Sequence, residues 1–514
     1  MQKPFMFIDW GDGWKSLNDP LQDIAVLAQF SVQWGVETAD EQPDPSVMSF
    51  TLRDLRGWLT GRALTLAGAR ILVQISEQPT WAMLTDAMGT WKVQRMPLNR
   101  LHSAYAPPIP SNPDSTAITL FDGIVSNGGT ATAHKTGWKL KLTASSRLLL
   151  WKRLAKQGPT STDVRWAGQH WVTTTIAARL AELNTRAREV NAPEADAAGL
   201  ETTGTPASYD TTDYPTQLDL LHRLYAHHPH MPLWYEVPHK DASVIEYTPL
   251  NRPVTMGAST DGTLTITDQG TVTPAIPAPL VETDDDFTLT VPEPLTQITL
   301  KAKKATADDG VLSFEDDETQ MGDRGLLPEN LTATQSSFTL ESDIATQDDT
   351  GGILGRANGT IWTPSEQNRI AAARWLETID RRLTPETIVF DGRKIDPADR
   401  PELYRTSPPG VFTLQGARSG TLADDTSRPA TGGAYTAIGG TLTFEWADQT
   451  PVLRNEVTLW PIPLDTDHQA TWADMQAWPP TWAQTAMSLA ELGLVSAYDQ
   501  PAIIDQPNWE GAQP

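Results

Sequence analysis

The sequence predicts a mainly β protein with an α+β insertion, in which two β domains flank one small α+β domain. Three observations predict this class. Apolar residues alternate in short runs in the first part of the chain, helical spacing replaces the alternation in the middle, and alternation returns in the second half. Turn-forming residues are frequent, with 40 Pro and 35 Gly in 514 residues, a length that suits about three or four domains.

Five alternating runs predict the strands of the first β domain. Each run places apolar side chains at every second position and is bounded by Gly, Pro or polar residues. The runs are Phe30–Trp34, Ser49–Leu52, Ala69–Ile75, Ile118–Val125 and Trp138–Thr143. Five short strands with turns between them predict a small barrel or sandwich.

Helical spacing follows this region, because apolar residues recur three and four positions apart. The predicted helices are Ser146–Lys156, Trp171–Val190 and Thr216–Tyr225. The segment Asn191–Thr211 is rich in Ala, Gly, Thr and acidic residues and is predicted to be a loop. Leu233–Val237 and Val244–Tyr247 predict a hairpin, joined through Pro238–Asp241. Together these elements predict a small α+β domain.

Strand patterns return in the second half, with Thr at the polar positions. The predicted strands are Thr263–Thr267, Phe287–Val291, Gln297–Ala302, Thr387–Phe390, Gly410–Leu414, Gly440–Phe444 and Glu456–Trp460. One helix is predicted among them. Thr363 caps it, Pro364 occupies its first turn, Glu366 stands three residues after the cap, and helical spacing continues to Leu383.

The last part of the chain, after Pro463, is rich in Trp, Pro, Ala and Gln. One helix is predicted near Thr481–Leu492, and the rest is predicted to be an extended arm. Trp472, Trp478 and Trp482 are candidate partner-interface residues, because Trp often anchors protein interfaces. Trp also stacks on sugar rings, so contact with carbohydrate is the alternative for this arm.

Charge and composition exclude several functions. Asp and Glu outnumber Lys and Arg by 64 to 39, which gives a formal charge of −25. Attraction to nucleic-acid phosphate or anionic lipid is therefore not expected as the main activity. The absence of Cys excludes disulfides, thiol nucleophiles and thiolate metal sites. The start of the chain does not read as a signal peptide and no apolar run reaches about 18 residues, so a soluble chain is expected.

Histidine and acidic clusters are weak candidates for metal sites. The densest histidine group is His222, His227, His228 and His230, with His239 nearby. It contains no H-E-x-x-H motif and Pro229 interrupts it, so a solvated turn is expected in place of a zinc site. Acidic pairs occur in Glu282–Asp286, Asp308–Asp309, Asp316–Asp317, Asp348–Asp349 and Asp9–Gly13. None follows the calcium-loop pattern, so solvated loops are expected and no metal or cofactor is predicted.

Catalytic motifs are missing as well. The sequence contains no G-x-S-x-G nucleophile elbow, no G-x-x-x-x-G-K-[ST] phosphate loop and no strand-linked G-x-G-x-x-G. Paired carboxylates serve glycosidases, but 64 acidic residues give no means of choosing a pair. No catalytic residue is assigned, and the chain is expected not to be an enzyme.

The order and spacing of these patterns carry a family resemblance. The segments in the first β domain are Phe30–Gly35, Pro45–Asp54, Gly68–Val73 and Leu120–Val125. The segments in the second are Ala371–Leu376, Pro385, Gly410–Leu414, Ile438–Thr441 and Val457–Pro461. Taken in sequence, they resemble the tail-tip hub family of long-tailed bacteriophages, also called baseplate hub or minor tail proteins. The resemblance covers most of Phe30–Pro463, and the acidic segment Asp308–Asp323 is an insertion with no assigned place in it.

The resemblance implies a fold and its division into domains. Two tail-tube-like β-barrel domains are expected, with the small α+β domain between them. The expected domains are residues 1–148 for the N-terminal segment and first barrel, 149–252 for the α+β domain, 253–463 for the second barrel with its inserted helix, and 464–514 for the C-terminal arm.

The resemblance also implies a function, that of a structural virion protein at the tail tip. Such a hub joins the hexameric tail tube or distal tail ring to the threefold tip and lines the channel for genome ejection. Its expected partners are two further copies in a homotrimer, the distal tail protein, the tape measure protein, and other minor tail or receptor-binding proteins. DNA is expected only in transit, and the acidic composition predicts a channel that repels phosphate.

Two alternatives stay open. A distal tail ring protein would assemble as a hexamer with one tube-type barrel per chain. The other alternative is a tail-tip protein that binds cell-wall polysaccharide, or a glycosidase that hydrolyses it.

Overall fold

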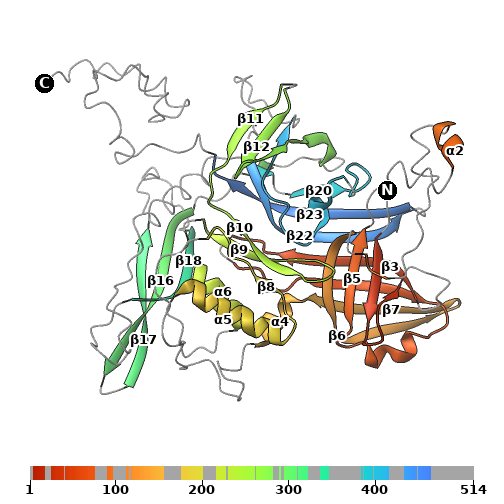
Figure 1. Cartoon of the computed structure of the whole chain (residues 1–514), viewed down its shortest axis with the longest axis horizontal. Helices are drawn as coiled ribbons and strands as arrows, with labels where there is room; N and C mark the ends of the chain where they lie inside the picture. Colours follow the sequence, from red (N-terminus) through yellow and green to blue (C-terminus); the bar gives the residue numbers. More distant parts are fainter. Residues whose placement is uncertain are drawn as a thin grey trace.

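The computed structural model is built mainly from β-strands, with short helices between the two ends of the chain (Figure 1). It describes residues 4–17, 25–39, 41–75, 89–95, 112–114, 117–154, 175–200, 216–226, 228, 230–260, 262–281, 289–290, 295–308, 311–321, 336–346, 384–385, 387–397, 399–415, 433–447 and 450–464.

One sheet of twelve strands draws on both ends of the chain. Its N-terminal strands are β1 (Phe5–Asp9), β2 (Lys15–Ser16), β3 (Val26–Gly35), β4 (Val47–Asp54), β5 (Arg70–Ile75), β6 (Ile118–His134) and β7 (Gly137–Ser146). Its C-terminal strands are β14 (Ile276–Pro277), β20 (Thr387–Asp391), β21 (Phe412–Gln415), β22 (Ala434–Ala447) and β23 (Thr450–Ile462). The order is β14–β21–β22–β3–β4–β7–β6–β5–β1–β2, with β23 beside β22 and β20 beside β23.

The N-terminal strands close into a barrel. The backbone N–H of Leu27 in β3 donates a 2.8 Å hydrogen bond to the carbonyl of Leu17, which directly follows β2. The two ends of the series β2–β1–β5–β6–β7–β4–β3 therefore meet. All five strands expected between Phe30 and Thr143 are present, and β1 and β2 are additional to the expectation.

The C-terminal strands form a second unit whose ends also meet. Its series is β20–β23–β22–β21–β14. The backbone N–H of Val389 in β20 donates a 3.3 Å hydrogen bond to the carbonyl of Val281, which lies shortly after β14 in the chain. The expected strands at Thr387, Gly410, Gly440 and Glu456 are all present within this unit.

The two units share one strand order. In the first, β4, β5, β6 and β7 follow one another along the chain and lie in the order β5–β6–β7–β4, with every pair antiparallel. In the second, β20, β21, β22 and β23 lie in the order β21–β22–β23–β20, again with every pair antiparallel. The two β units are therefore alike in topology over these four strands.

Strand β22 joins the two units. One of its edges pairs with β23, and the other pairs first with β21 at Ala434–Tyr435 and then with β3 at Gly439–Phe444. Glycine permits the close approach, because a Cβ on Gly35 would lie 2.2 Å from the carbonyl oxygen of Ile438 and Gly35 has φ +71°. The rings of Phe30 and Phe444 pack 5.5 Å apart across the seam.

The α+β unit lies between the two halves of the sheet in sequence. Its elements are α4 (Leu148–Arg153), α5 (Ile176–Glu189), β8 (Glu194–Ala195), α6 (Gln217–Tyr225), β9 (Pro232–Val237) and β10 (Val244–Pro249). The three helices and the hairpin agree with the sequence expectation, and Thr216 and Asp219 form a capping box at the start of α6. The sheet order is β8–β10–β9, and the helices lie on one side of it (Figure 1).

The short strand β8 departs from the loop expected at Asn191–Thr211. Asn184 on α5 holds it in place, since its side-chain amide donates to the carbonyl of Ala195 and accepts from the Ala195 N–H, both at 2.8 Å. This long-range bracket leaves no periodic pattern in the sequence. Residues 201–211 of the expected loop lie outside the described residues.

Smaller sheets and helices complete the described part. The strands are β11 (Thr255–Ala258), β12 (Leu264–Asp268), β13 (Thr271–Pro274), β15 (Leu289–Thr290), β16 (Leu295–Asp308), β17 (Val311–Met321), β18 (Ser336–Thr346) and β19 (Thr384–Pro385). The helices are α2 (Thr90–Arg95) and the 3-10 helices η1 (Thr60–Thr65), η3 (Ala278–Leu280) and η4 (Pro401–Tyr404). No helix in the described ranges is long and apolar enough to cross a membrane.

The acidic segment Asp308–Asp323 has a regular structure over most of its length. It supplies β17, which pairs antiparallel with β16, while β18 pairs with β16 in parallel. The register sets Lys301 opposite Glu318 and Lys303 opposite Asp316.

Two expected features fall outside the described residues. They are the helix capped by Thr363 and, apart from Leu464, the C-terminal arm with its helix near Thr481–Leu492.

Candidate functional site

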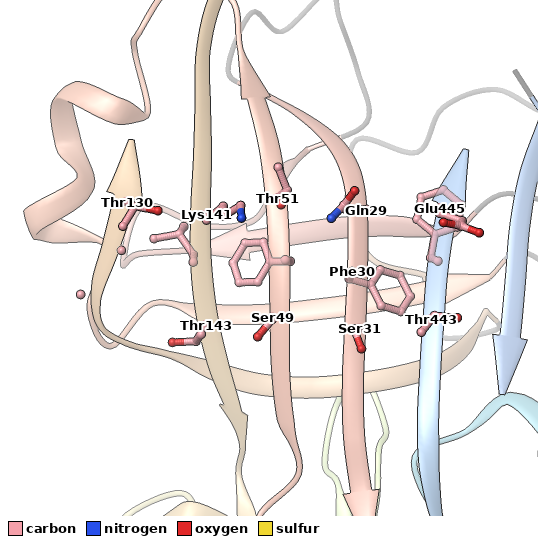
Figure 2. Close-up of a pocket in the computed structure, with 15 residues that line it drawn as sticks. Gln29, Phe30, Ser31, Ser49, Thr51, Thr130, Lys141, Thr143, Thr443 and Glu445 are labelled. Atoms are coloured by element: carbon pink, nitrogen blue, oxygen red, sulfur yellow. The ribbon is translucent and has the colours of Figure 1, made fainter. Parts of the chain in front are cut away.

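A shallow cavity lies on one face of the main sheet where five strands run side by side. It has a volume of about 830 Å³ and is lined by residues of β6, β7, β4, β3 and β22 (Figure 2). The cavity therefore crosses the seam between the two units, because β22 belongs to the second and the other four strands to the first.

Polar side chains form two rows across these strands. The pairing registers align Thr443, Ser31, Ser49 and Thr143 as one row. They align Gln29, Thr51, Lys141 and Thr130 as a second row. Figure 2 shows both rows, with Thr130 at one end and Glu445 at the other end of the second. The two rows give the cavity regularly spaced polar side chains, and Phe30, Phe50, Leu142 and Phe444 are also among the residues that line it.

The strand period explains this surface. Along β3, Gln29 and Ser31 point to the cavity face, while Phe30 between them is buried at 3% exposure. Along β4, Ser49 lies on the same face and Phe50 is buried at 2% exposure. The alternation that predicts these strands thus also separates a polar outer face from an aromatic interior.

The face carries little net charge. Lys141 and Glu445 are the charged residues among those that line the cavity, and they cancel, although the whole chain carries −25. Within the described ranges, no group of three or more His, Asp or Glu residues is placed to hold a metal ion. Hydroxyl and amide groups both donate and accept hydrogen bonds, and each such bond is worth only about 0.5–1.5 kcal/mol in net terms.

A second polar cluster joins the first barrel to the α+β unit. Arg70 on β5 donates to both carboxylate oxygens of Asp122 on β6, at 2.9 and 2.8 Å. Arg70 also donates to the carbonyl of Lys240, and the hydroxyl of Ser243 donates to Asp122 at 2.9 Å. Asp122 has no exposed side-chain surface, so these bonds replace the water that its carboxylate loses. The cluster ties the β9–β10 loop to the barrel wall.

Glu236 on β9 lies next to this cluster. One of its oxygens accepts a 2.7 Å hydrogen bond from the backbone N–H of Leu148, and the other is buried without a hydrogen-bond partner in the described part. Burial raises the pKa of Glu236 from its usual 4.5 to about 8, and the charge of Asp122 adds to the rise. Glu236 is therefore mostly protonated at neutral pH.

The residues singled out from the sequence lie elsewhere. Trp472, Trp478 and Trp482 are outside the described residues, as is His227. His222 lies on α6, where burial lowers its pKa to about 4. In the turn after α6, the His230 N–H donates to the ring of His228 at 3.1 Å, so this turn is held by bonds within itself. The carboxylate of Asp9 accepts from the N–H groups of Gly11 and Gly13 and stabilises its own loop.

Sequence reasoning missed both the polar face and the cluster around Asp122. The face had a usable signal, because Ser, Thr and Gln alternate with Phe, Leu and Val in β3, β4 and β7. The cluster had none, since Arg70, Asp122 and Ser243 are far apart in the chain and meet only through the fold.

Comparisons with known proteins found no match to a family model and no similar curated sequence. Several solved structures superpose on most of the chain with low TM-scores. The tail protein from Neisseria meningitidis MC58 has a TM-score of 0.41 and 10% identity, covering 90% of this chain and 100% of that one. The 43 kDa tail protein of prophage MuSo2 from Shewanella oneidensis has a TM-score of 0.41 and 7% identity, covering 88% and 98%.

The prophage tail protein gp18 from Listeria monocytogenes EGD-e has a TM-score of 0.34 and 8% identity, covering 88% of this chain and 94% of that one. With TM-scores of 0.41 or less, these overlaps do not establish a shared fold.

Proposed function

We propose that this chain is a structural protein of a bacteriophage tail, and within the tail its tip hub. The observation that carries the proposal is the repeated strand order of two β units in one chain, β5–β6–β7–β4 and β21–β22–β23–β20. Three such chains around an axis present six similar units, which fits a hexameric tube on one side and a threefold tip on the other.

The seam between the units suits this role. β22 pairs with strands of both units, and the ring of Trp34 donates a 3.1 Å hydrogen bond to Asn455 on β23 across the same seam. Both units are therefore held in one fixed relation, as a collar that bears load requires. Their edges meet internally, which reduces the unpaired backbone that would otherwise promote aggregation.

The polar face is the surface that we assign to the channel. Its charges cancel, so DNA phosphate would be neither held nor strongly repelled there, and its hydroxyls would offer weak contacts that exchange quickly. This assignment differs from the acidic channel expected from composition, because the negative surplus of the chain lies outside the cavity lining.

The proposed partners follow from a place at the tail tip. They are two further copies of the chain, the distal tail protein, the tape measure protein and other minor tail or receptor-binding proteins. The C-terminal arm, with Trp472, Trp478 and Trp482, is proposed to dock on one of these neighbours. No catalytic step is part of the proposal.

The test is the mass of the purified chain, followed by an image of the assembled tail. Native mass spectrometry should give three times 56.3 kDa, and the image should place the chain at the tip around a threefold axis. A monomer at all concentrations contradicts the proposal. A hexamer would favour the distal ring, and clearing of peptidoglycan by folded protein would favour a glycosidase.

A further inference from the structure

Strands β6 and β22 occupy the same place in their two units. Each is the first strand of a hairpin with a two-residue loop, closed by the pairs His134–Gly137 and Ala447–Thr450. Counting back from these closing pairs, Ala131 corresponds to Phe444 and Gly129 to Leu442. Both strands also shift register partway along, between Val125 and Gly129 in β6 and between Ala437 and Gly439 in β22.

The outer edges of the two strands differ in what covers them. In β22, the edge beyond β21 is filled by β3, where Phe444 pairs with Phe30 and Leu442 with Val32. In β6, the edge beyond β5 pairs with no strand in the described part of the chain. Residues 128–134 are all exposed.

The open edge of β6 directs backbone groups outward. In an antiparallel hairpin with a two-residue loop, the closing pair is hydrogen-bonded and every second pair after it is too. His134, Thr132 and Thr130 therefore bond to β7. Ala131 and Gly129 then direct their N–H and carbonyl groups toward the open side.

Beyond the register shift at Val125–Gly129, this edge carries none of the charges or prolines that keep edges apart. Natural edge strands carry Lys, Pro or inward charges that prevent pairing with another chain. Residues 126–133 read Ser-Asn-Gly-Gly-Thr-Ala-Thr-Ala, with no charge and no proline. An exposed, uncharged edge of this kind is suited to receive a strand.

We infer that the β6 edge at Gly129–Ala133 receives a β-strand from a second copy of this chain, as the matching edge of β22 receives β3. The inference rests on the proposed trimeric hub. Because β3 belongs to the first unit and β22 to the second, the repeated contact runs from the second unit of one copy to β6 of the next. Head-to-tail contacts of this kind close into a ring when the rotation between copies matches the threefold axis of the proposed hub. The polar face then continues from copy to copy past Thr130.

Hydrogen exchange on the unaltered full-length chain tests the edge directly. Peptides that cover residues 126–134 should exchange at least about tenfold more slowly in the trimer than in the diluted monomer, because a paired amide exchanges only when the ladder opens. Equal exchange in a trimer overturns the inference while the hub proposal stands. A chain that is monomeric at every concentration overturns both.

Two variants of one residue give the matched test. Ala131→Pro removes the outward N–H but no bond to β7, so the chain should fold and its trimer should dissociate at concentrations at least about tenfold higher. Ala131→Val keeps the N–H and favours a strand, so its trimer should match the unaltered chain. A trimer unaffected by proline, or lost equally with valine, overturns the inference, and far-UV circular dichroism verifies that each variant is folded.

Discussion

The carboxylate of Glu236 accepts a 2.7 Å hydrogen bond from the backbone N–H of Leu148, which joins β9 to the first turn of α4. The acid lies between helices and barrel wall, and its second oxygen is buried without a hydrogen-bond partner in the described part. Ionising it would place a second negative charge near Asp122.

Glu236 should make the stability of the fold decrease as the pH rises from about 4.5 to about 8. Its pKa is about 8 in the folded chain against a usual 4.5, so the folded state binds the proton more tightly than the unfolded state. Its stabilising effect is full below about pH 4.5 and is lost as pH rises through about 8. Glu236→Gln should lose less stability than the unaltered chain between about pH 4.5 and 8 in thermal unfolding. Glu246→Gln, at an exposed position of β10, is the control and should leave the profile unchanged.

Substituting Arg70 should lower the free energy of unfolding far more than substituting an exposed cation does. Arg70→Met would leave the buried Asp122 with weaker partners and should cost about 3 kcal/mol of unfolding free energy. Lys152→Met breaks the Lys152–Asp44 pair, whose side chains are 45% and 71% exposed, and should cost at most about 1 kcal/mol. Urea denaturation measures both, and equal losses would contradict the assigned role of the cluster.

The seam between the units should be sensitive to a single methyl group. A Cβ at Gly439 would lie 2.2 Å from the carbonyl oxygen of Val36, so Gly439→Ala should cost about 1–3 kcal/mol and speed amide exchange in β3. Gly61→Ala is the matched control, because nothing lies within 4 Å of its added Cβ. If both variants melt at the same temperature, β3 and β22 do not pack as closely as described.

The C-terminal arm should be dispensable for folding from residue 465 onward, but not earlier. Val254 donates a 2.9 Å hydrogen bond to the carbonyl of Pro463, and Leu464 is buried beside it at 9% exposure. A chain that ends at Leu464 should unfold at the temperature of the full chain and assemble more weakly. A chain that ends at Ile462 should unfold at a lower temperature. If the chain that ends at Leu464 does not fold, the residues after Leu464 are part of a core.

Local pattern predicts much of this fold, and the reasons for its failures are physical. Strands with one buried face, such as β3 and β4, are visible because their residues alternate. β1 is not, since Phe5, Met6, Phe7 and Ile8 are all buried and read as a continuous apolar run.

The candidate site follows the same division. Alternation predicts that Ser31 lies on the polar side of β3 and that Ser49 lies on the polar side of β4. The neighbours of that face cannot be read from it, because β3 and β22 come from opposite ends of the chain. Glu236 reads as an exposed charge in a hairpin, but β9 packs on the barrel through Tyr235 and on the helices through Trp234, so neither of its faces meets water.

The pairing of β3 with β22 can form only late in translation, because the two strands lie near opposite ends of the chain. Trp34 must wait for Asn455, which lies 421 positions later, and at a translation rate of about 5–20 residues per second this delay is roughly 20–80 s. During that time, the outer edge of β3 emerges from the ribosome without its native neighbour. The N-terminal half of the nascent chain therefore carries an unpaired strand edge, which is open to non-native pairing until translation ends.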